Sequence, residues 1–160
     1  KITKKQVLKF LKEHRHISIA TVTEDGKPEV ATVYYGVDNQ LNLYIPTGTL
    51  SRKFKNIKKN HHVALAVTDV EKLTTVQIEG IASVELITKK NHHVIPILSD
   101  ALSPGIWSSI KHLFDPIPPV IKMKNGLLVI LKVKINWARW ADFTLPVSET
   151  KGKYYNEVKI

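Results

Sequence analysis

Short apolar runs separated by tight turns fill residues 17–86, and this order constrains the fold more than any other feature of the sequence. The first run, at residues 17–23, is followed by the turn sequence Glu24-Asp-Gly-Lys-Pro28, and a later turn carries Asp38-Asn39. Runs rich in β-branched residues and bounded by such turns predict antiparallel strands joined by hairpins. Short strands connected in this way favour a small β-barrel.

One helix-like segment interrupts these strands, within residues 47–60. Ser51 is typical of a helix N-cap, which would place a hydroxyl beside the free backbone N–H groups and the positive end of the helix dipole. Arg52 and Lys53 add two cations at the same place. This combination is suited to a phosphate monoester, since the hydroxyl and amides donate and the cations neutralise the dianion. The alternative interpretation is a cationic surface helix with an ordinary cap.

In the order of its elements, this part of the chain resembles the pyridoxamine 5′-phosphate oxidase-like family, the FMN-binding split barrels. The matching residues are 19–28, 43–47, 51–53, Asn56, Ile57, Asn60 and 80–85, and the match extends more loosely to residues 127–143. The resemblance implies one domain over residues 1–160, of α+β class but dominated by β. Its centre would be a split β-barrel of about six or seven mainly antiparallel strands with a few flanking helices.

The resemblance also implies a place for each part of an FMN cofactor. The phosphate would lie on Ser51, Arg52 and Lys53. The ring would lie along one strand and be read by its backbone amides and carbonyls, at Val30, Ala31, Thr32, Val33 and Tyr34. The ribityl chain would be lined by Tyr44, Ile45 and Thr47, with Thr75 and Gln77 as further candidates. The oxidase itself commonly has an amide side chain at the position of Thr75, and this sequence departs from it there.

A family member with FMN is expected to be an oxidoreductase that passes a hydride or electrons between a small-molecule substrate or electron donor and the flavin. FMN supplies the redox chemistry, so the protein need only bind and orient it. No catalytic acid or base is predicted. The oxidase's C-terminal Arg-x-His substrate motif is absent from residues 154–160, which favours a relative of unknown substrate. The alternatives are a deazaflavin- or haem-binding split barrel and a non-enzymatic basic module that binds nucleic acid or protein.

The net charge of +10, from 24 Lys plus Arg against 14 Asp plus Glu, also requires an explanation. No helix-turn-helix, zinc-finger or RNP motif accompanies these cations, so a nucleic-acid partner is not expected.

No metal site is predicted, because the side chains of the paired histidines at 61–62 and 92–93 point apart in a strand or helix. The absence of cysteine, of a membrane-length apolar run and of a signal-peptide core leads us to expect a cytoplasmic protein without a membrane partner.

Residues 88–119 depart most from a minimal split barrel and are predicted to be a helical insertion. Thr88 would cap a helix that continues to about Ala101, the Ser-Pro-Gly at 103–105 would end it, and residues 106–114 would form another helix. The prolines within 115–119 would then force an extended chain.

We expect a homodimer with each flavin near the interface, because a split barrel of this size leaves one face and its cofactor half-covered, and symmetric pairs are common. The apolar residues 127–131 and three tryptophans, Trp107, Trp137 and Trp140, offer surface for this contact. Tryptophans are more often core residues. The sharper alternative is that one of them, with Arg139, covers the flavin of a neighbouring subunit.

Overall fold

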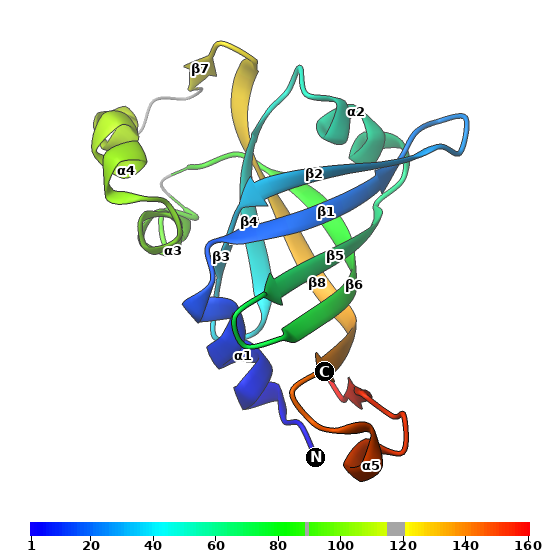
Figure 1. Ribbon diagram of the computed structural model, residues 1–160. Helices are drawn as coiled ribbons and strands as arrows, with labels where there is room; N and C mark the ends of the chain where they lie inside the picture. Colours follow the sequence, from blue (N-terminus) through cyan, green and yellow to red (C-terminus); the bar gives the residue numbers. More distant parts are fainter. Residues whose placement is uncertain (89, 115–120) are drawn as a thin grey trace.

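The structure, a computed structural model, describes residues 1–88, 90–114 and 121–160 (Figure 1). Its helices are α1 (Lys4–Glu13), α2 (Arg52–Lys59), α3 (Val94–Ala101), α4 (Pro104–Ile110), the 3₁₀ turn η1 (Lys111–Phe114) and α5 (Val147–Thr150). Its strands are β1 (His16–Val22), β2 (Pro28–Tyr34), β3 (Gly36–Val37), β4 (Asn42–Gly48), β5 (His62–Asp69), β6 (Thr74–Glu85), β7 (Lys122–Met123), β8 (Gly126–Asp142) and β9 (Tyr155–Val158).

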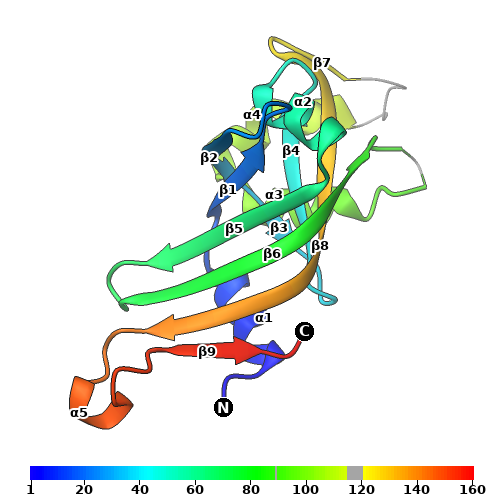
Figure 2. The same ribbon diagram turned by 90° about the vertical axis from the view of Figure 1, so that its right-hand side faces the viewer.

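Seven strands form one curled antiparallel sheet in the order β2-β1-β5-β6-β8-β4-β3, and the short strands β7 and β9 add to β8. In Figure 1, β1, β2 and β5 cross in front of β4 and β8, and Figure 2 shows the long curve of β6 and β8. The register shifts between Glu79 and Gly80. A Cβ at Gly80 would lie 2.8 Å from the Lys134 carbonyl oxygen, so this close approach requires glycine. The predicted fold class, a β-dominated split barrel with flanking helices, is confirmed.

The barrel interior is filled by alternate residues of the strands and is covered at one end by α1 (Figure 1). Val7, Phe10 and Leu11 are the buried face of this helix. The Tyr35 hydroxyl donates a 2.6 Å hydrogen bond to the Leu11 carbonyl oxygen, which ties the end of β2 to α1. A second apolar cluster joins α3 to the outer side of β4 and β8, around Tyr44 and Leu98.

The insertion is helical where the structure describes it, but its first helix starts later than predicted. Thr88 does not cap a helix, because its backbone N–H and its hydroxyl both bond the Asn91 side chain in a turn (2.6 and 3.2 Å). The helix begins at Val94 with Pro96 in its first turn, where proline is tolerated. Ser103 instead caps α4 by accepting from the Ile106 N–H. The extended chain predicted for residues 115–119 lies outside the described residues.

Candidate functional site at the N-terminus of α2

The N-terminus of α2 is built by a capped turn that is clamped to the β7–β8 hairpin. The Ser51 hydroxyl accepts from the Phe54 N–H at 3.3 Å and lies 3.1 Å from the Thr47 hydroxyl. Before the cap, the Leu50 N–H donates to the Asn125 carbonyl oxygen at 2.9 Å. Ile57 is fully buried and fixes the helix to the barrel. The predicted N-cap is therefore confirmed, and it is held in place from both sides.

A hollow of about 470 Å³ opens between this helix end and strand β2. We call it the α2 hollow, and it is lined by Ile19, Thr21, Glu29, Val30, Ala31, Ser51, Arg52 and Lys53. Five of the thirteen predicted cofactor residues thus meet around one space, although they lie some twenty residues apart in the sequence. A volume of this size falls in the usual range of small-molecule sites, about 300–1,000 Å³.

Strand β2 lies at one end of the sheet order and presents backbone groups along its open side. At the two ends of β2, the Tyr35 N–H donates to the Arg15 carbonyl oxygen and the Thr23 N–H donates to the Lys27 carbonyl oxygen. The backbone N–H and C=O groups of the odd-numbered residues between these bonds therefore point toward β1. The N–H and C=O groups of Val30, Thr32 and Tyr34 consequently point away from β1. The Ala31 and Val33 side chains pack instead on the barrel core. This edge offers the alternating donors and acceptors that a flavin pyrimidine ring requires.

The two cations of the α2 hollow are in different environments. Lys53 is half-buried, and burial lowers the pKa of its ammonium group. Arg52 is exposed and makes an ion pair with Glu29, whose carboxylate also accepts from the Asn56 side chain at 2.8 Å. Neither Glu29 nor Asn56 was predicted to be a site residue, although Asn56 is among the residues that carry the family resemblance. The Glu29 carboxylate lies beside the predicted phosphate position because α2 packs against β2, and the sequence alone does not reveal this contact.

The residues predicted to line the ribityl chain are more deeply buried. Ile45 is fully buried in the barrel core, and Tyr44 is buried in the second cluster, where its hydroxyl donates to Asp38 at 3.1 Å. Thr47 is buried but reaches the site through its contact with Ser51. Neither Tyr44 nor Ile45 is among the residues that line the α2 hollow. Their predicted contact with a cofactor stays a prediction.

The remaining predicted residues lie on the outer face of the sheet. Thr75 shares a 2.9 Å hydrogen bond with Thr68, and Gln77 accepts from Arg139 Nε at 2.9 Å. Gln77 and Arg139 line a second hollow of about 370 Å³, here called the outer trough. Its floor is made of small residues from β1 and β5, and its rim of larger ones: Ser18, Ala20, Ala64 and Ala66, then Val30, Gln77, Glu79, Trp137 and Arg139.

The three tryptophans and the apolar strand that were expected at a dimer contact lie in different parts of the structure. Trp137 lies at the rim of the outer trough, near the Arg139 guanidinium, which also stacks 4.2 Å from the Tyr155 ring. Trp140 contacts Phe10 at the core with ring centroids 5.1 Å apart, and Trp107 packs against the second cluster. The run predicted to offer contact surface is largely buried within the chain, from Leu128 to Leu131. An interface must therefore use other residues.

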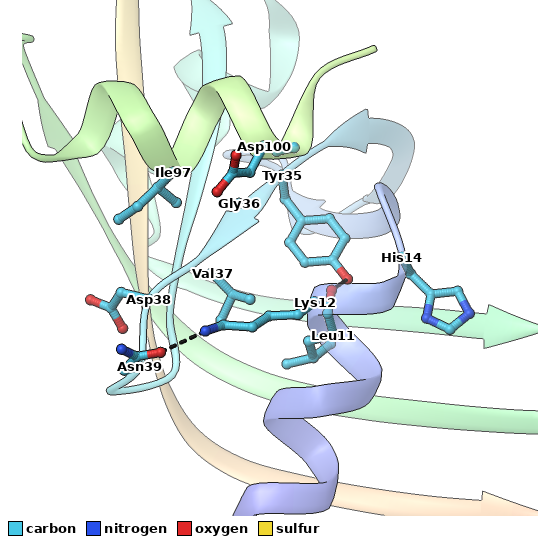
Figure 3. A pocket seen from close by; sticks show the side chains of 11 residues that line it. Leu11, Lys12, His14, Tyr35, Gly36, Val37, Asp38, Asn39, Ile97 and Asp100 are labelled. Carbon is cyan, nitrogen blue, oxygen red and sulfur yellow. Dashed lines mark hydrogen bonds between the residues drawn. The ribbon is translucent and has the colours of Figure 1, made fainter. Parts of the chain in front are cut away.

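A third hollow, about 330 Å³, lies where the end of α1 meets β3 and α3 (Figure 3). Lys12 reaches across it and donates a 2.6 Å hydrogen bond to the Asn39 side chain. None of the predicted cofactor residues lines this space. Among the residues that the structure describes, no group of three or more His, Cys, Asp or Glu side chains is placed to hold a metal ion. No helix within the same residues is long and apolar enough to cross a membrane.

Comparison with known proteins places this geometry in context. The family model for pyridoxamine 5′-phosphate oxidase matches residues 3–93. Among solved structures, a conserved hypothetical protein from Mycobacterium tuberculosis has a TM-score of 0.71 at 20% identity, covering 91% of this chain and 90% of that chain. A pyridoxamine 5′-phosphate oxidase-related, FMN-binding protein from Nostoc punctiforme has a TM-score of 0.59 at 16% identity, covering 94% and 82%.

A haem-binding protein from Mycobacterium smegmatis is also similar, with a TM-score of 0.63 at 13% identity, covering 90% of this chain and 52% of that chain. At these identities the structural likenesses show the fold alone. The search of curated protein sequences finds no match.

Proposed function

The chain belongs to the pyridoxamine 5′-phosphate oxidase family, and from that premise we propose that it binds FMN at the α2 hollow and acts as a flavin-dependent oxidoreductase. One observation carries the proposal: Ser51, Arg52 and Lys53 meet the open edge of β2 around a single space. An anion site and a row of backbone donors and acceptors are the two features that a flavin mononucleotide requires.

In this proposal each part of the site has a distinct role. The Ser51 hydroxyl, the first N–H groups of α2 and the two cations bind the phosphate, where charge-assisted hydrogen bonds are strongest. The backbone groups of Val30, Thr32 and Tyr34 orient the pyrimidine edge of the ring. Bound FMN supplies hydride and electron transfer, so the chain's own residues need only position the ring and admit a substrate.

The haem alternative has less support at this place. None of the described residues that line the α2 hollow or the outer trough is a histidine, a common axial ligand of haem iron. A deazaflavin cofactor would use the same anion site for its phosphorylated tail, so geometry does not separate it from FMN. A basic module for nucleic acid or protein would need no chromophore at all.

Two measurements test the proposal. The visible absorbance spectrum of the purified protein distinguishes flavin, deazaflavin, haem and no chromophore. Titration of the apo protein with FMN and with riboflavin then tests the phosphate contact, and we expect FMN to bind at least about tenfold more tightly. Equal affinities for FMN and riboflavin would contradict the anion site. A Soret band would show that the bound cofactor is haem and not FMN.

The proposal includes a homodimer in which the outer trough of one subunit covers the flavin of the other. Ser and Ala side chains make the floor of the trough, and exposed apolar side chains lie on the same face of the sheet, with Val30 73% exposed and Ile81 38% exposed. Apolar surface of this kind favours protein contact. Trp137 and Arg139 would then be the residues that reach the partner's ring.

A further inference from the structure

An apolar cavity of about 430 Å³ lies next to the α2 hollow, and Lys53 lines both spaces. We call it the insertion cavity, because α3 and α4 supply one of its walls, while the end of β4 and the β7–β8 hairpin supply the others. Its apolar lining comes from Pro46, Leu98, Leu102, Ile106, Met123 and Leu128. The volume is again in the range of small-molecule sites, about 300–1,000 Å³.

The walls of the insertion cavity are held by the fold. Leu98 and Leu128 are buried members of the second cluster, so their positions are set by packing. The hairpin is locked onto β4, since a Cβ at Gly48 would lie 2.4 Å from the Asn125 carbonyl oxygen. The Leu127 N–H also donates to the Thr49 hydroxyl at 2.9 Å. The cavity is therefore a formed space between fixed elements.

The polar groups of the insertion cavity are all compatible with an anion. Lys53, Lys122 and Asn125 line it together with Thr47, and no acidic residue among those that the structure describes is part of the lining. Across the described parts of the chain, no carboxylate lies within ion-pair distance of either lysine. Lys53 is half-buried without such a partner, which is a costly state for a cation. Ile106 and Met123 are partly exposed, at 37% and 42%, and form an apolar part of the lining that solvent can reach.

We propose that the insertion cavity binds a small amphipathic carboxylate, a molecule with an aliphatic body and one carboxylate head. The body fills the space among Leu98, Leu102 and Leu128. The head lies toward Lys122 and Lys53, where the Asn125 amide donates a further hydrogen bond. A neutral apolar molecule would leave the ammonium groups without a counter-charge, and a compact polar anion would leave the apolar lining unfilled. The site needs no flavin, so it can be tested without the cofactor, although it shares Lys53 with the α2 hollow.

The first test is a chain-length series measured by calorimetry on the full chain without cofactor. Hexanoate, octanoate and decanoate are the probes, and 1-octanol is the neutral control. Because each methylene is buried, we expect the affinity to rise roughly tenfold for each step of two methylenes. We expect octanol to bind at least about fivefold more weakly than octanoate, since it cannot pair with the lysines.

The second test uses variants on the lining of the cavity. Ile106→Glu places a carboxylate on a partly exposed position and should weaken octanoate binding at least about tenfold. Lys122→Gln should weaken octanoate about fivefold and octanol less than twofold. Lys124→Gln, an exposed lysine in the same hairpin that does not line the cavity, is the matched control and should bind as the wild type does.

The proposal is overturned if wild type binds no octanoate, or if either Ile106→Glu or Lys122→Gln binds it as tightly as wild type. A titration of Ile106→Glu with FMN separates this proposal from the cofactor site. If FMN binds neither protein while octanoate passes both tests, the cofactor proposal fails and the insertion cavity stands.

Discussion

The Glu29 carboxylate of β2 accepts a 2.8 Å hydrogen bond from the Asn56 amide of α2, and this contact joins two of the elements that line the α2 hollow. Asn56 also donates to the buried Thr21 hydroxyl at 3.0 Å, so its position is fixed. The other Glu29 oxygen pairs with Arg52. A negative charge thus lies beside the proposed phosphate position and opposes the anion that the cations attract.

Replacing Glu29 with Gln should strengthen FMN binding. The amide oxygen of Gln still accepts from Asn56 or Arg52, but the like charge near the phosphate is gone. For a partly exposed pair this repulsion is worth about 1 kcal/mol, so we expect FMN affinity to rise roughly three- to tenfold. Fluorescence titration with FMN and riboflavin measures the effect. Riboflavin affinity should not change, and an equal gain for both ligands would show that charge is not the cause.

Replacing Arg52 and Lys53 together with Ala should weaken FMN binding at least about 100-fold, because two charge-assisted contacts are lost. The free energy of unfolding of the apo protein should change little, since neither side chain is fully buried. The matched control is Lys58→Ala with Lys59→Ala, which removes the same charge from the exposed far end of α2. If FMN affinity falls by the same factor in both double variants, the effect comes from the net charge of the protein. The α2 hollow would then be a solvated surface and not a phosphate site.

Local sequence patterns predicted the parts of this site that depend on neighbouring residues. The hairpin between β1 and β2 follows from the Asp25-Gly26 turn, and the helix start follows from Ser51, because a cap needs only the three residues after it. The succession of such elements favoured a small barrel, and the family resemblance that this succession carries implied a split barrel. These are short-range properties, so one sequence was enough to find them.

The partners of the site depend on tertiary contacts and could not be predicted in the same way. Glu29 reaches Arg52 and Asn56 only through the packing of α2 on β2, and Gln77 meets Arg139 only through the register of β6 against β8. Ile45 lies on a strand that leads to the site, yet its side chain faces the core. Thr88 was misassigned as a helix cap because its hydroxyl has an equally good local partner in Asn91.

Acid should destabilise the protein partly through Asp38. Its burial acts to raise the pKa of this carboxyl, but hydrogen bonds from the Asn42 side chain, the Asn42 and Gln40 backbone amides and the Tyr44 hydroxyl hold the pKa below its usual range. A lowered pKa in the folded state contributes stability that is present above the unfolded pKa of about 3.9. That contribution is lost as the pH falls through the lower folded pKa.

Urea unfolding of wild type and Asp38→Asn at several pH values measures this contribution. At pH 6 the variant should be less stable, because an amide cannot accept all of these bonds. The difference in unfolding free energy should begin to shrink below about pH 4, where the Asp38 carboxylate of the unfolded wild type becomes protonated, and should keep shrinking as the pH falls through the lower folded pKa. If the difference in unfolding free energy stays constant with pH, the variant has lost stability through altered packing and not through the loss of the carboxylate charge. Asp100→Asn, at an exposed position, is the control for loss of a carboxylate elsewhere.

FMN binding should quench the fluorescence of Trp137 and leave Trp140 unaffected. Trp137 lies at the rim of the outer trough, whereas the Trp140 ring contacts Phe10 at the core. The quenching measured in wild type should therefore be strongly reduced in Trp137→Phe and retained in Trp140→Phe. Quenching that is unchanged in both variants and in Trp107→Phe would place all three rings away from the flavin.

Placing a long charged side chain on the floor of the outer trough should separate the proposed dimer. Ala66 is on the outer face of β5, opposite Ser18 and Gln77 in the register, so Ala66→Arg should leave the barrel core intact. We expect light scattering to give a dimer for wild type and a monomer for this variant, with weaker FMN binding because the partner's trough no longer covers the ring. Ser148→Arg, an exposed position on α5, is the control and should stay dimeric. A wild-type monomer at micromolar concentration with FMN fully bound would contradict the shared site. If the Ala66→Arg variant is still a dimer, the interface lies on another face of the protein.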